Sequence, residues 1–497
     1  MEINTWVLTR KACQSWDEQT IKRGLPSKTL MAMAAQSAFD IICQEEWFSP
    51  NLRFHILVGG GNNGGDGYVL AWLLAGVMEN PVKVYVYQKP YRDDAIFYHN
   101  LCRLHERIEI VDFAEFAIKD LSAQDVVVDA IFGTGFNKEL PSELSHFFAE
   151  LNQKQVRRIA MDLPSGVFAD GDFFEHVPFS ANLTITMGAM KPGLLLPPGI
   201  YYSGKVVRAV TAFVPIPKSK GRMARKQAIP PLRRVDGHKY SSGVLHLWGG
   251  SAGMEGAAVL AGSAFLASGG GLVRWFSSSE HAFKYLQSSP ELMVRFYDKQ
   301  DELEVELLSS LKRAKKALLA MGMGLREKPS PEFVQELLAM EDLIWLMDAS
   351  FLHYLSSYEQ FFQLKQRKSV FVMTPHQGEA EALLGKKIHN YRETALELAQ
   401  RYQAFVYLKG PGGILVSPEG EEIYFHSRAY NLATGGTGDI LSGLICSFLL
   451  RPLAPLEAIE QAILFYLDAA LEFQDRADFF AASCLVEVFR RKNEVLQ

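Results

Sequence analysis

Short apolar runs alternate with helix-like segments along the whole chain. In the first half, four runs rich in Val and Ile predict buried β-strands: FHILV (54–58), VKVYVY (82–87), DVVVDAIF (125–132) and RRIAMDL (157–163). Helix-like segments such as YVLAWLLAGV (68–77) lie between them. Because strands that alternate with helices usually pair in parallel, the pattern predicts a sheet covered by helices on both faces.

The second half repeats this style of pattern. Its strand candidates are GVLHLWGG (243–250), KKALLAMG (315–322), DLIWLMDAS (342–350), KSVFVMT (368–374) and AFVYLKG (404–410). Each run ends in Gly, Asp, Thr-Pro or Lys-Gly. Ligands of open α/β sheets bind beyond the carboxyl ends of the strands, so these endings are where we expect functional residues.

The chain divides near residues 215–236, PIPKSKGRMARKQAIPPLRRVD, which hold four prolines and many Lys and Arg but few large apolar residues. This composition is typical of an exposed linker. No aromatic residue is interleaved with the basic ones, which disfavours a nucleic-acid-binding arm. A length of 497 residues is too great for one ordinary core, so we expect domains over residues 1–220 and 228–497.

Charge and cysteine content exclude several classes of function. A net charge of −5 creates no general attraction for nucleic acid. The five cysteines are scattered without a CxxC motif, so we expect neither a disulfide framework nor a zinc site, and a reducing cytoplasm fits. The first residues lack the apolar region of a secretory signal. Glycine and serine interrupt the longest apolar stretch, 257–273, which favours a buried helix over a membrane span.

A glycine-rich segment, GGGNNGGDG (59–67), follows the first predicted strand. Gly59, Gly61 and Gly64 satisfy the GxGxxG pattern of dinucleotide-binding folds. A redox Rossmann site also needs an acidic residue at the end of the second strand, where this chain has Gln88. Three Asx side chains and glycine N–H groups favour a polar ligand or cation over a plain turn.

Two further strands end in polar residues. Asp129 belongs to VVVDAIFGTGF, and Asp162 precedes Pro-Ser-Gly in IAMDLPSG. Either aspartate alone is more often a cap or a turn residue than a catalyst. Convergence of three polar strand ends on one sheet edge favours a site in which a carboxylate acts as a general base.

At this point the first half resembles a known family. GGGNNGGDGYVLA, VDAIFGTGF, AMDLPSGV and MGAMKPGLLLPPG are similar, in family order, to the N-terminal YjeF-type epimerase domain of bifunctional NAD(P)H-hydrate repair enzymes. That family interconverts the R and S epimers of hydrated NADH and NADPH, which carry a hydroxyl on C6 of the reduced ring. The resemblance implies a Rossmann-like three-layer α/β/α sandwich.

The resemblance also implies roles for particular residues. Asp162 would bind the nicotinamide end and act as the acid/base, and a potassium ion would be held by Asn63, Asp129 and Ser165. The residues expected to contact the hydrate, including its phosphates, are Asn62, Asn63, Gly64, Gly65, Asp66, Gly133, Thr134, Gly135, Phe136, Asn137, Lys138, Glu139 and Asp162.

Three features stand out in the second half. WGGSAGMEGAA (248–258) is another glycine loop, and MTPHQGEAEALLG (373–385) places His376 at a strand end. NLATGGTGDILSG (431–443) places glycines and Asp439 at the start of an apolar helix. Backbone N–H groups at such a start form an anion hole, beside which an aspartate can activate a hydroxyl that attacks a phosphoryl group. As a simple helix cap, Asp439 would not need the preceding TGGTG.

These motifs resemble the ribokinase-like superfamily and, more narrowly, the ADP-dependent NAD(P)H-hydrate dehydratase domain. That family uses ADP to dehydrate the S hydrate, and a magnesium ion is expected on the nucleotide. Asp439 would deprotonate the C6 hydroxyl, which is phosphorylated and lost as phosphate. The resemblance implies hydrate contacts at Ala257, Gly324, His376 and Asp439, and nucleotide contacts at Lys409, Gly410, Pro411, Gly412, Gly413 and Gly438.

The second half departs from its family pattern at several positions. GMGLR puts Arg326 where glycine is usual, DAS puts Ser350 in place of an aspartate, and KGPGG puts Gly413 in place of a threonine. Three hypotheses therefore stand: a fused epimerase and dehydratase, a ribokinase-type kinase with an accessory domain, or an epimerase with a decayed, nucleotide-sensing second domain. The first hypothesis implies NADHX, NADPHX and ADP as small-molecule substrates, no nucleic-acid or membrane partner, and a homo-oligomer.

Overall fold

The computed structural model describes residues 6–211, 214, 219–230, 242–287, 289–364, 368–427, 429–473 and 480–495. The chain forms two units: Met1–Arg222 with His389–Arg392, and Met223–Ile388 with Glu393–Gln497. Parts of the expected linker, 215–218 and 231–236, lie outside the described residues. The expectation that residues 1–220 and 228–497 act as two separate catalytic domains stays a prediction.

The first unit is built on a seven-stranded, wholly parallel sheet in the order β4-β3-β2-β5-β6-β7-β8. Its strands are β2 (Arg53–Val58), β3 (Val82–Val86), β4 (Ile108–Asp112), β5 (Asp125–Ala130), β6 (Arg157–Met161), β7 (Leu183–Met187) and β8 (Lys205–Ala209). The short strand β1 (Trp6–Val7) pairs antiparallel with β9 (Gly221–Met223). The four strands predicted from the first half are β2, β3, β5 and β6.

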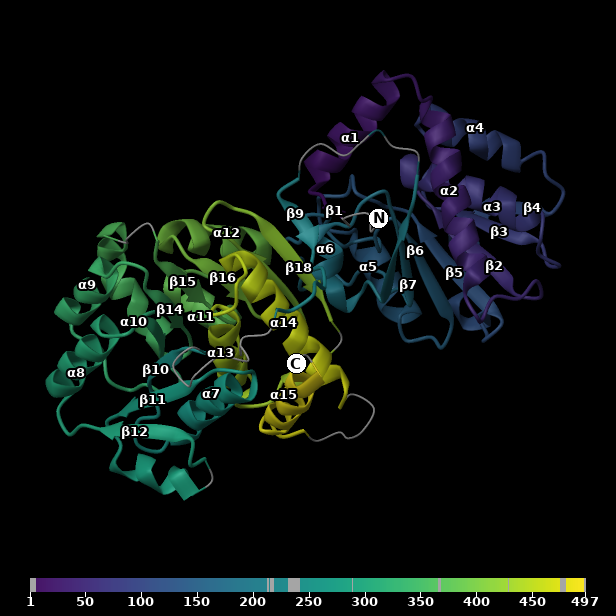
Figure 1. Cartoon of the computed structure of the whole chain (residues 1–497). Helices are drawn as coiled ribbons and strands as arrows, with labels where there is room; N and C mark the ends of the chain where they lie inside the picture. The colour runs from purple at the N-terminus through teal and green to yellow at the C-terminus, as the bar shows by residue number, and fades with distance from the viewer. Residues whose placement is uncertain are drawn as a thin grey trace. The chain divides into compact units, whose positions relative to one another are not determined.

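Helices cover both faces of this sheet (Figure 1), as the alternating pattern predicts. One core joins α2 and α3 to strand residues such as Ile56 and Val128, and the other joins α5 to their neighbours Leu57 and Val127. The helices of this unit are α1 (Arg10–Lys22), α2 (Ser27–Gln44), α3 (Asn62–Ala75), α4 (Asp93–Cys102), α5 (Ser142–Leu151) and α6 (Pro192–Leu195), with 3₁₀ turns η1 (Phe113–Glu115), η2 (Ile118–Asp120) and η3 (Gly199–Tyr201).

The second unit contains a larger sheet, with the order β18-β17-β16-β15-β14-β13-β10-β11-β12. Strands from β16 to β12 run parallel, while β17 and β18 are antiparallel additions at one side. The strands are β10 (Val244–Trp248), β11 (Leu272–Ser277), β12 (Leu292–Phe296), β13 (Leu318–Met321), β14 (Ile344–Met347), β15 (Val370–Met373), β16 (Phe405–Leu408), β17 (Gly412–Val416) and β18 (Glu422–His426).

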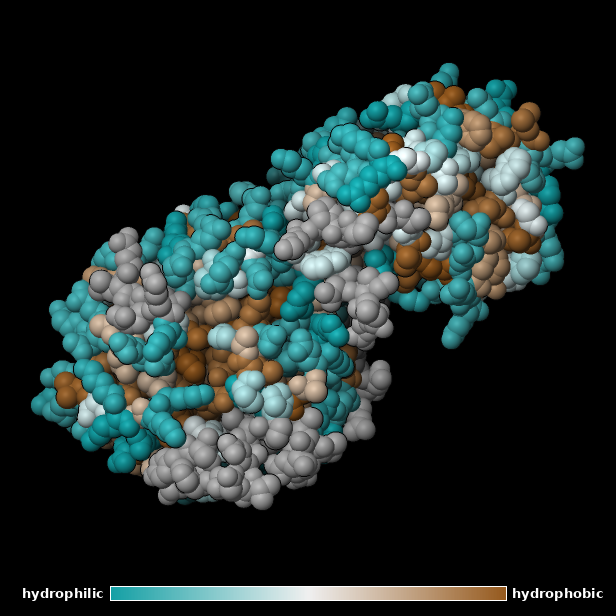
Figure 2. Space-filling view, turned by 45° about the horizontal axis from the view of Figure 1, so that its top comes forward, coloured by the Kyte–Doolittle hydropathy of each residue, from teal (hydrophilic) through white to brown (hydrophobic). Residues whose placement is uncertain are grey.

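Helices again cover this sheet, and α7, α13, α14 and α15 share one large apolar core with the strands (Figure 1). Polar residues cover most of the surface seen in Figure 2, and apolar residues gather in a recess of the second unit. The helices are α7 (Glu255–Ala267), α8 (Gln300–Lys312), α9 (Pro331–Ala339), α10 (Ser350–Leu355), α11 (Gln377–Leu384), α12 (Tyr391–Tyr402), α13 (Thr437–Phe448), α14 (Pro455–Leu471) and α15 (Cys484–Val495), with 3₁₀ segments η4 (Glu280–Gln287), η5 (Ser356–Leu364) and η6 (Tyr430–Leu432).

Both sheets reverse their strand order once. In the first unit the chain runs outward through β2, β3 and β4, then returns to place β5 on the other side of β2. In the second unit β13 returns to the free side of β10 in the same way. A crevice forms at such a reversal because successive connections leave in opposite directions. No helix among the described residues is long and apolar enough to cross a membrane.

Candidate functional site

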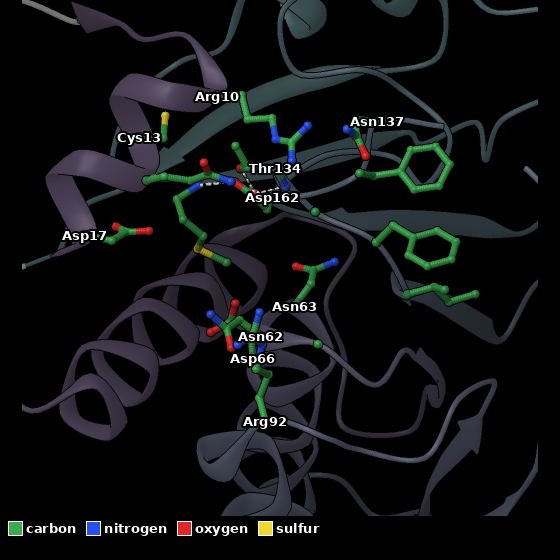
Figure 3. A pocket seen from close by; sticks show the side chains of 18 of the residues that line it. Arg10, Cys13, Asp17, Asn62, Asn63, Asp66, Arg92, Thr134, Asn137 and Asp162 are labelled. Carbon is green, nitrogen blue, oxygen red and sulfur yellow. Dashed lines mark hydrogen bonds between the residues drawn. The ribbon is translucent and has the colours of Figure 1, made fainter. Parts of the chain in front are cut away.

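A cavity of about 520 Å³ opens in the first unit beside the ends of β2 and β5, where the strand order reverses (Figure 3). This is the position at which open α/β sheets bind ligands. The predicted site residues that line it are Asn62, Asn63, Asp66, Gly133, Thr134, Gly135, Phe136, Asn137, Lys138 and Asp162. Segments from Asn62 to Asp162, far apart in the sequence, therefore meet in one cavity.

The glycine-rich segment is not the loop that the sequence predicts. Helix α3 begins at Asn62, so most of this segment forms the first turns of the helix. The glycines are needed for close packing: a Cβ on Gly59 would lie 2.1 Å from the carbonyl oxygen of Ile131, and one on Gly64 would lie 1.9 Å from that of Gly59. The close approach brings the helix N-terminus, with its free N–H groups, to the cavity.

Asp162 is held by four donors at the end of β6. One carboxylate oxygen accepts from the backbone N–H (2.9 Å) and the hydroxyl of Thr134, and the other accepts from Met187 N–H (3.2 Å) and Lys191 Nζ (2.5 Å). Burial alone would raise the pKa of Asp162, but the Lys191 charge and the Thr134 donors outweigh it and hold the pKa below its usual range. Its backbone adopts φ 66, a strained conformation that aims the carboxylate into the cavity.

Lys191 is a site residue that sequence reasoning missed. Its side chain is buried and also donates to Thr186 Oγ1 (2.8 Å) and to the carbonyl of Met187 (3.0 Å). Burial lowers the pKa of Lys191, but the Asp162 carboxylate more than compensates and the pKa lies above its usual value. The one available signal was a lysine within the apolar motif MGAMKPGLLLPPG. Its partner, 29 residues earlier, was not recognisable from spacing.

Three predicted contact residues do not line this cavity. Gly64 and Gly65 face neighbouring protein atoms, with a Cβ on Gly65 meeting the side chain of Met31. Glu139 instead contacts His176, whose Nδ1 and N–H both lie against its carboxylate. The loop that starts at Gly133 does reach the cavity through Lys138. Direct contact of these three residues with a ligand stays a prediction.

The three predicted potassium ligands lie at neighbouring strand ends. Asp129 accepts from Ser165 N–H (2.6 Å) and from its hydroxyl (2.7 Å), and burial raises the pKa of Asp129 to about 6 despite these donors. Asn63 follows β2, which pairs with β5 so that Leu57 lies opposite Asp129. Both amide atoms of Asn63 are buried without a hydrogen-bond partner. A cation would pair with the buried carboxylate and with this amide oxygen.

Helix α1 adds residues to the cavity that the sequence did not single out. Arg10, Cys13, Gln14 and Asp17 line it from this helix. Figure 3 shows the side chain of Asp17 and that of Cys13 on the side of the cavity opposite Asn137. Burial, followed by the charge of Asp162, raises the pKa of Asp17 to about 6, although Lys191 opposes this shift. The start of α1 lacks any motif that would have marked these residues.

In the second unit, a cavity of about 310 Å³ lies beside the start of α13. It is lined by five predicted site residues: His376, Lys409, Gly410, Pro411 and Gly438. Apolar and aromatic side chains complete it, including Tyr407, Leu441 and Tyr466. A polar edge formed by Lys409 and the helix start, facing an apolar wall, suits a ligand with phosphates and a flat base.

Lys409 connects the charged groups of this site. Its Nζ donates to Asp348 (2.9 Å), whose other oxygen accepts from the Ser442 hydroxyl (2.7 Å). Glu379 lies 4.0 Å from the same ammonium group. Burial lowers the pKa of Lys409, but the Asp348 and Glu379 charges raise it above its usual value. No sequence pattern pairs Asp348, which follows β14, with Lys409.

Asp439 occupies the first turn of α13, behind Gly436, whose φ of 90 is left-handed. Burial raises the pKa of Asp439 to about 7, the Asp348 and Glu379 charges add to the shift, and Lys409 reduces it. A Cβ on Gly438 would lie 3.5 Å from Lys409 Nζ, so the helix start approaches the ammonium closely. Asp439 can therefore exchange a proton near neutral pH beside an anion-binding helix terminus.

Of the four hydrate contacts predicted for this unit, only His376 lines the 310 Å³ cavity. Ala257 and Gly324 are neighbours, because a Cβ on Gly324 would lie 3.4 Å from that of Ala257. His376 lines the cavity and also caps α11, where its Nδ1 accepts from Glu379 N–H at 3.3 Å. Ala257, Gly324 and Asp439 do not line the 310 Å³ cavity. A shared hydrate pocket for these four residues stays a prediction.

The structure accounts for two departures from the family pattern. A side chain at Gly413 would lie 2.5 Å from the Tyr407 hydroxyl, so the phenol excludes threonine there. Arg326 is exposed, and its backbone is bonded to the Ser251 and Tyr354 hydroxyls at 3.0 and 2.7 Å. Nothing in the structure explains Ser350.

Both halves of the chain match family models. Residues 27–193 match the family described as YjeF-related protein N-terminus, and residues 245–488 match NAD(P)H-hydrate dehydratase.

Curated relatives extend over nearly the whole chain. The bifunctional NAD(P)H-hydrate repair enzyme Nnr of Coxiella burnetii is 30% identical over 471 residues, which are 90% of this chain and 91% of that protein. The enzyme of the same name from Escherichia coli is 31% identical over 454 residues, 88% and 83% of the two chains. The solved ADP/ATP-dependent NAD(P)H-hydrate dehydratase of Bacillus subtilis, co-crystallised with ATP/Mg²⁺, is 25% identical and aligns with a TM-score of 0.45 over 54% of this chain and 95% of that one.

Replacing Lys191 by Met should destabilise the first unit by about 3–5 kcal/mol, because the Asp162 carboxylate would stay buried without its cation. Lys205→Met is the control, since Lys205 is exposed and its ion pair with Glu45 should contribute about 1 kcal/mol or less. Urea denaturation followed by tryptophan fluorescence measures both. Equal midpoints for the two variants would contradict the role given to the buried pair.

Proposed function

The chain belongs to the family of bifunctional NAD(P)H-hydrate repair enzymes, and we propose that its two units perform successive steps of that repair. The first unit epimerises the R and S forms of hydrated NADH and NADPH. The second dehydrates the S form with ADP and returns NAD(P)H, AMP and phosphate. The protein is thus an isomerase and a lyase in one chain. The observation that carries the assignment to the first unit is the ionised Asp162 in the switch-point cavity, held by Lys191 and Thr134.

In the first unit, epimerisation requires proton transfer at the C6 hydroxyl or the ring nitrogen. Asp162 would take the hydroxyl proton as a general base, because its lowered pKa keeps it ionised. The Thr134 hydroxyl is the donor that a substrate hydroxyl can replace, since the other three donors are backbone N–H groups or the buried ammonium. The N-terminus of α3 and the loop after β5 would hold the phosphates.

A potassium ion fits the polar group below this cavity. Asn63, Asp129 and Ser165 would hold it, since the Asn63 amide is buried without a partner and Asp129 is a buried carboxylate. The ion would neutralise this carboxylate and fix the start of α3. It would thereby hold the glycine turn against β5.

In the second unit, Asp439 would remove the proton of the C6 hydroxyl as that oxygen attacks the terminal phosphoryl group of ADP. The start of α13 and Lys409 would bind the phosphates, and Tyr407 with Tyr466 would contact the base. The described residues contain no group of three or more His, Cys, Asp or Glu placed to hold a metal ion. Magnesium would be bound with the nucleotide, through its phosphates.

Assembly into a homo-oligomer and a cytoplasmic location, both expected from the sequence, stay predictions. One assay separates this proposal from the two other hypotheses, a ribokinase-type kinase and a decayed second domain. Mixed epimers of NADPH hydrate are supplied with ADP, with ATP or with neither, and restored NADPH is followed by absorbance. Complete restoration with ADP supports the proposal. Epimer exchange alone indicates a decayed domain, and nucleotide consumption only with an unrelated alcohol indicates a kinase.

In the same assay, Asp162→Asn should slow epimerisation by about 10²–10⁴-fold, the usual contribution of a general base. Because the second unit is unchanged, the S epimer should still be dehydrated at the normal rate. NADPH restoration should therefore stop at the S fraction. Full epimerase activity in this variant would contradict the role of Asp162.

The dehydration rate should depend on pH through Asp439. Only the ionised carboxylate is a base, so kcat/KM should rise about tenfold per pH unit below its pKa of about 7 and level off above it. Asp348→Asn removes a charge that raises this pKa and should move the midpoint to lower pH. Glu336→Gln, an exposed carboxylate of α9, is the control that should leave the midpoint unchanged. Loss of dehydration at high pH would contradict the base role.

Potassium should stabilise the first unit specifically, because an ion that binds only the folded state adds to its stability. The melting temperature in KCl should exceed that in NaCl at equal ionic strength, by about 2–4 °C per kcal/mol of binding. Asn63→Ala should remove the difference, and the surface variant Asn80→Ala should keep it. Identical melting temperatures in both salts for the unchanged protein would exclude a potassium-selective site.

A further inference from the structure

Epimerisation at C6 needs two proton transfers in opposite directions. Resting on the epimerase function proposed above, the simplest balanced route opens the ring: the hydroxyl loses its proton, C6 becomes a carbonyl carbon, the C6–N1 bond breaks and N1 gains a proton. Rotation about the neighbouring carbon–carbon bond presents the other face of the carbonyl, and the reverse steps close the ring with the opposite configuration. The site therefore needs one ionised base and one proton-bearing acid.

Asp162 supplies the base but not the acid. Its four hydrogen bonds all come from donors, and the Lys191 ammonium keeps it ionised. Lys191 is itself committed, because it donates to three oxygen atoms within 3.0 Å. The proton that N1 gains must come from another group in the cavity.

Helix α1 holds a carboxyl group over the same cavity. Its inner face is fixed by Cys13, Trp16 and Thr20, which are buried, and by the Trp16 indole, which donates to the Val214 carbonyl at 2.7 Å. Asp17 lies four residues after Cys13, so it is on the neighbouring part of the same helix face and lines the cavity. In Figure 3, Asp17 projects from α1, and Asp162 lies beside Thr134 further into the cavity.

We propose that Asp17 is the second acid/base of epimerisation, donating its proton to the ring nitrogen as the C6–N1 bond opens while Asp162 takes the hydroxyl proton. The two carboxyl groups exchange these roles when the ring closes. In many enzymes two carboxyl groups have different proton affinities because their surroundings differ. One of them then acts as the acid and the other as the base. Asp162 is stabilised as the anion by Lys191, whereas Asp17 has no hydrogen-bond partner among the described residues.

Five charged or titratable groups face Asp17. They are Lys191, Asp162 and Asp66 from the cavity, and Cys13 and Glu18 from its own helix. Burial and the neighbouring carboxylates raise the pKa of Asp17 to about 6, so this group both gives and takes protons near neutral pH. Burial raises the pKa of Cys13 to about 12, so this thiol does not release its proton near neutral pH, and burial also raises the pKa of Asp66 well above its usual value.

The test compares Asp17→Asn, Asp17→Glu and the same-helix control Glu18→Gln, each in the full chain. Exchange of the purified R epimer is measured from pH 5 to 9, and dehydration of the S epimer with ADP reports whether the chain is folded and active. Asp17→Asn should lower kcat for epimerisation about 10²-fold or more with KM nearly unchanged, while dehydration stays normal. Asp17→Glu should restore part of the rate, and Glu18→Gln should keep it.

The pH profile separates catalysis from a structural role. Because Asp17 must be protonated and Asp162 ionised, kcat/KM of the unchanged enzyme should fall above pH 6, and Asp17→Asn should lose this descending limb. The proposal is overturned if Asp17→Asn keeps the full rate or the limb, or if only KM rises. If the unchanged enzyme itself fails to exchange the epimers, the epimerase function fails instead, which is a distinct result.

Discussion

A lysine paired with an aspartate is the interaction on which both sites depend. In the first unit Lys191 pairs with Asp162, and in the second Lys409 pairs with Asp348. An ammonium held in such surroundings is tolerated only with a carboxylate and further acceptors around it. Each lysine therefore fixes the position of one aspartate side chain. The second carboxyl group of each site, Asp17 or Asp439, is left with a raised pKa, near 6 or 7.

Strand order and glycine packing decide where these pairs lie. Each sheet reverses its order once: the cavity of the first unit lies at that reversal, between β2 and β5, whereas Asp348 and Lys409 of the second unit follow β14 and β16, to one side of it. Glycines then allow the backbone segments there to touch: Gly59 packs on Ile131 in the first unit, and Gly249 packs on Met323 in the second. An alanine at either position would place a Cβ within 2.3 Å of a carbonyl oxygen. The positions of these loops thus rest on close contacts between backbone segments.

Sequence periodicity predicted the parallel sheets well, because buried strands of this class read as continuous apolar runs. The strand at 157–163, for example, appears as β6 (Arg157–Met161), with Asp162 just beyond its end as expected. The local sequence pattern did not predict site residues whose contacts join segments far apart in the sequence. Lys191 is one cation in an apolar motif until β6 and β7 are paired, and Asp17 is an exposed helix residue whose place at the cavity follows only from the position of α1. The prediction for the glycine-rich segment (59–67) was wrong for another reason. Its composition suggested a loop, whereas its glycines allow the close packing of a helix start.

The departures in the second unit point to repacking of a binding pocket rather than to its loss. Tyr407 places its hydroxyl where a threonine at 413 would lie, and the same aromatic ring lines the cavity beside Lys409. Tyr466 lines it from α14 and donates to the Thr437 carbonyl at 3.2 Å, which secures the start of α13. A pocket that had lost its ligand would gain little from keeping a raised-pKa aspartate beside a helix terminus. The ion pair of Lys409 with Asp348 (2.9 Å) forms beside this aromatic wall, so the glycine at position 413 leaves the charged edge of the cavity intact.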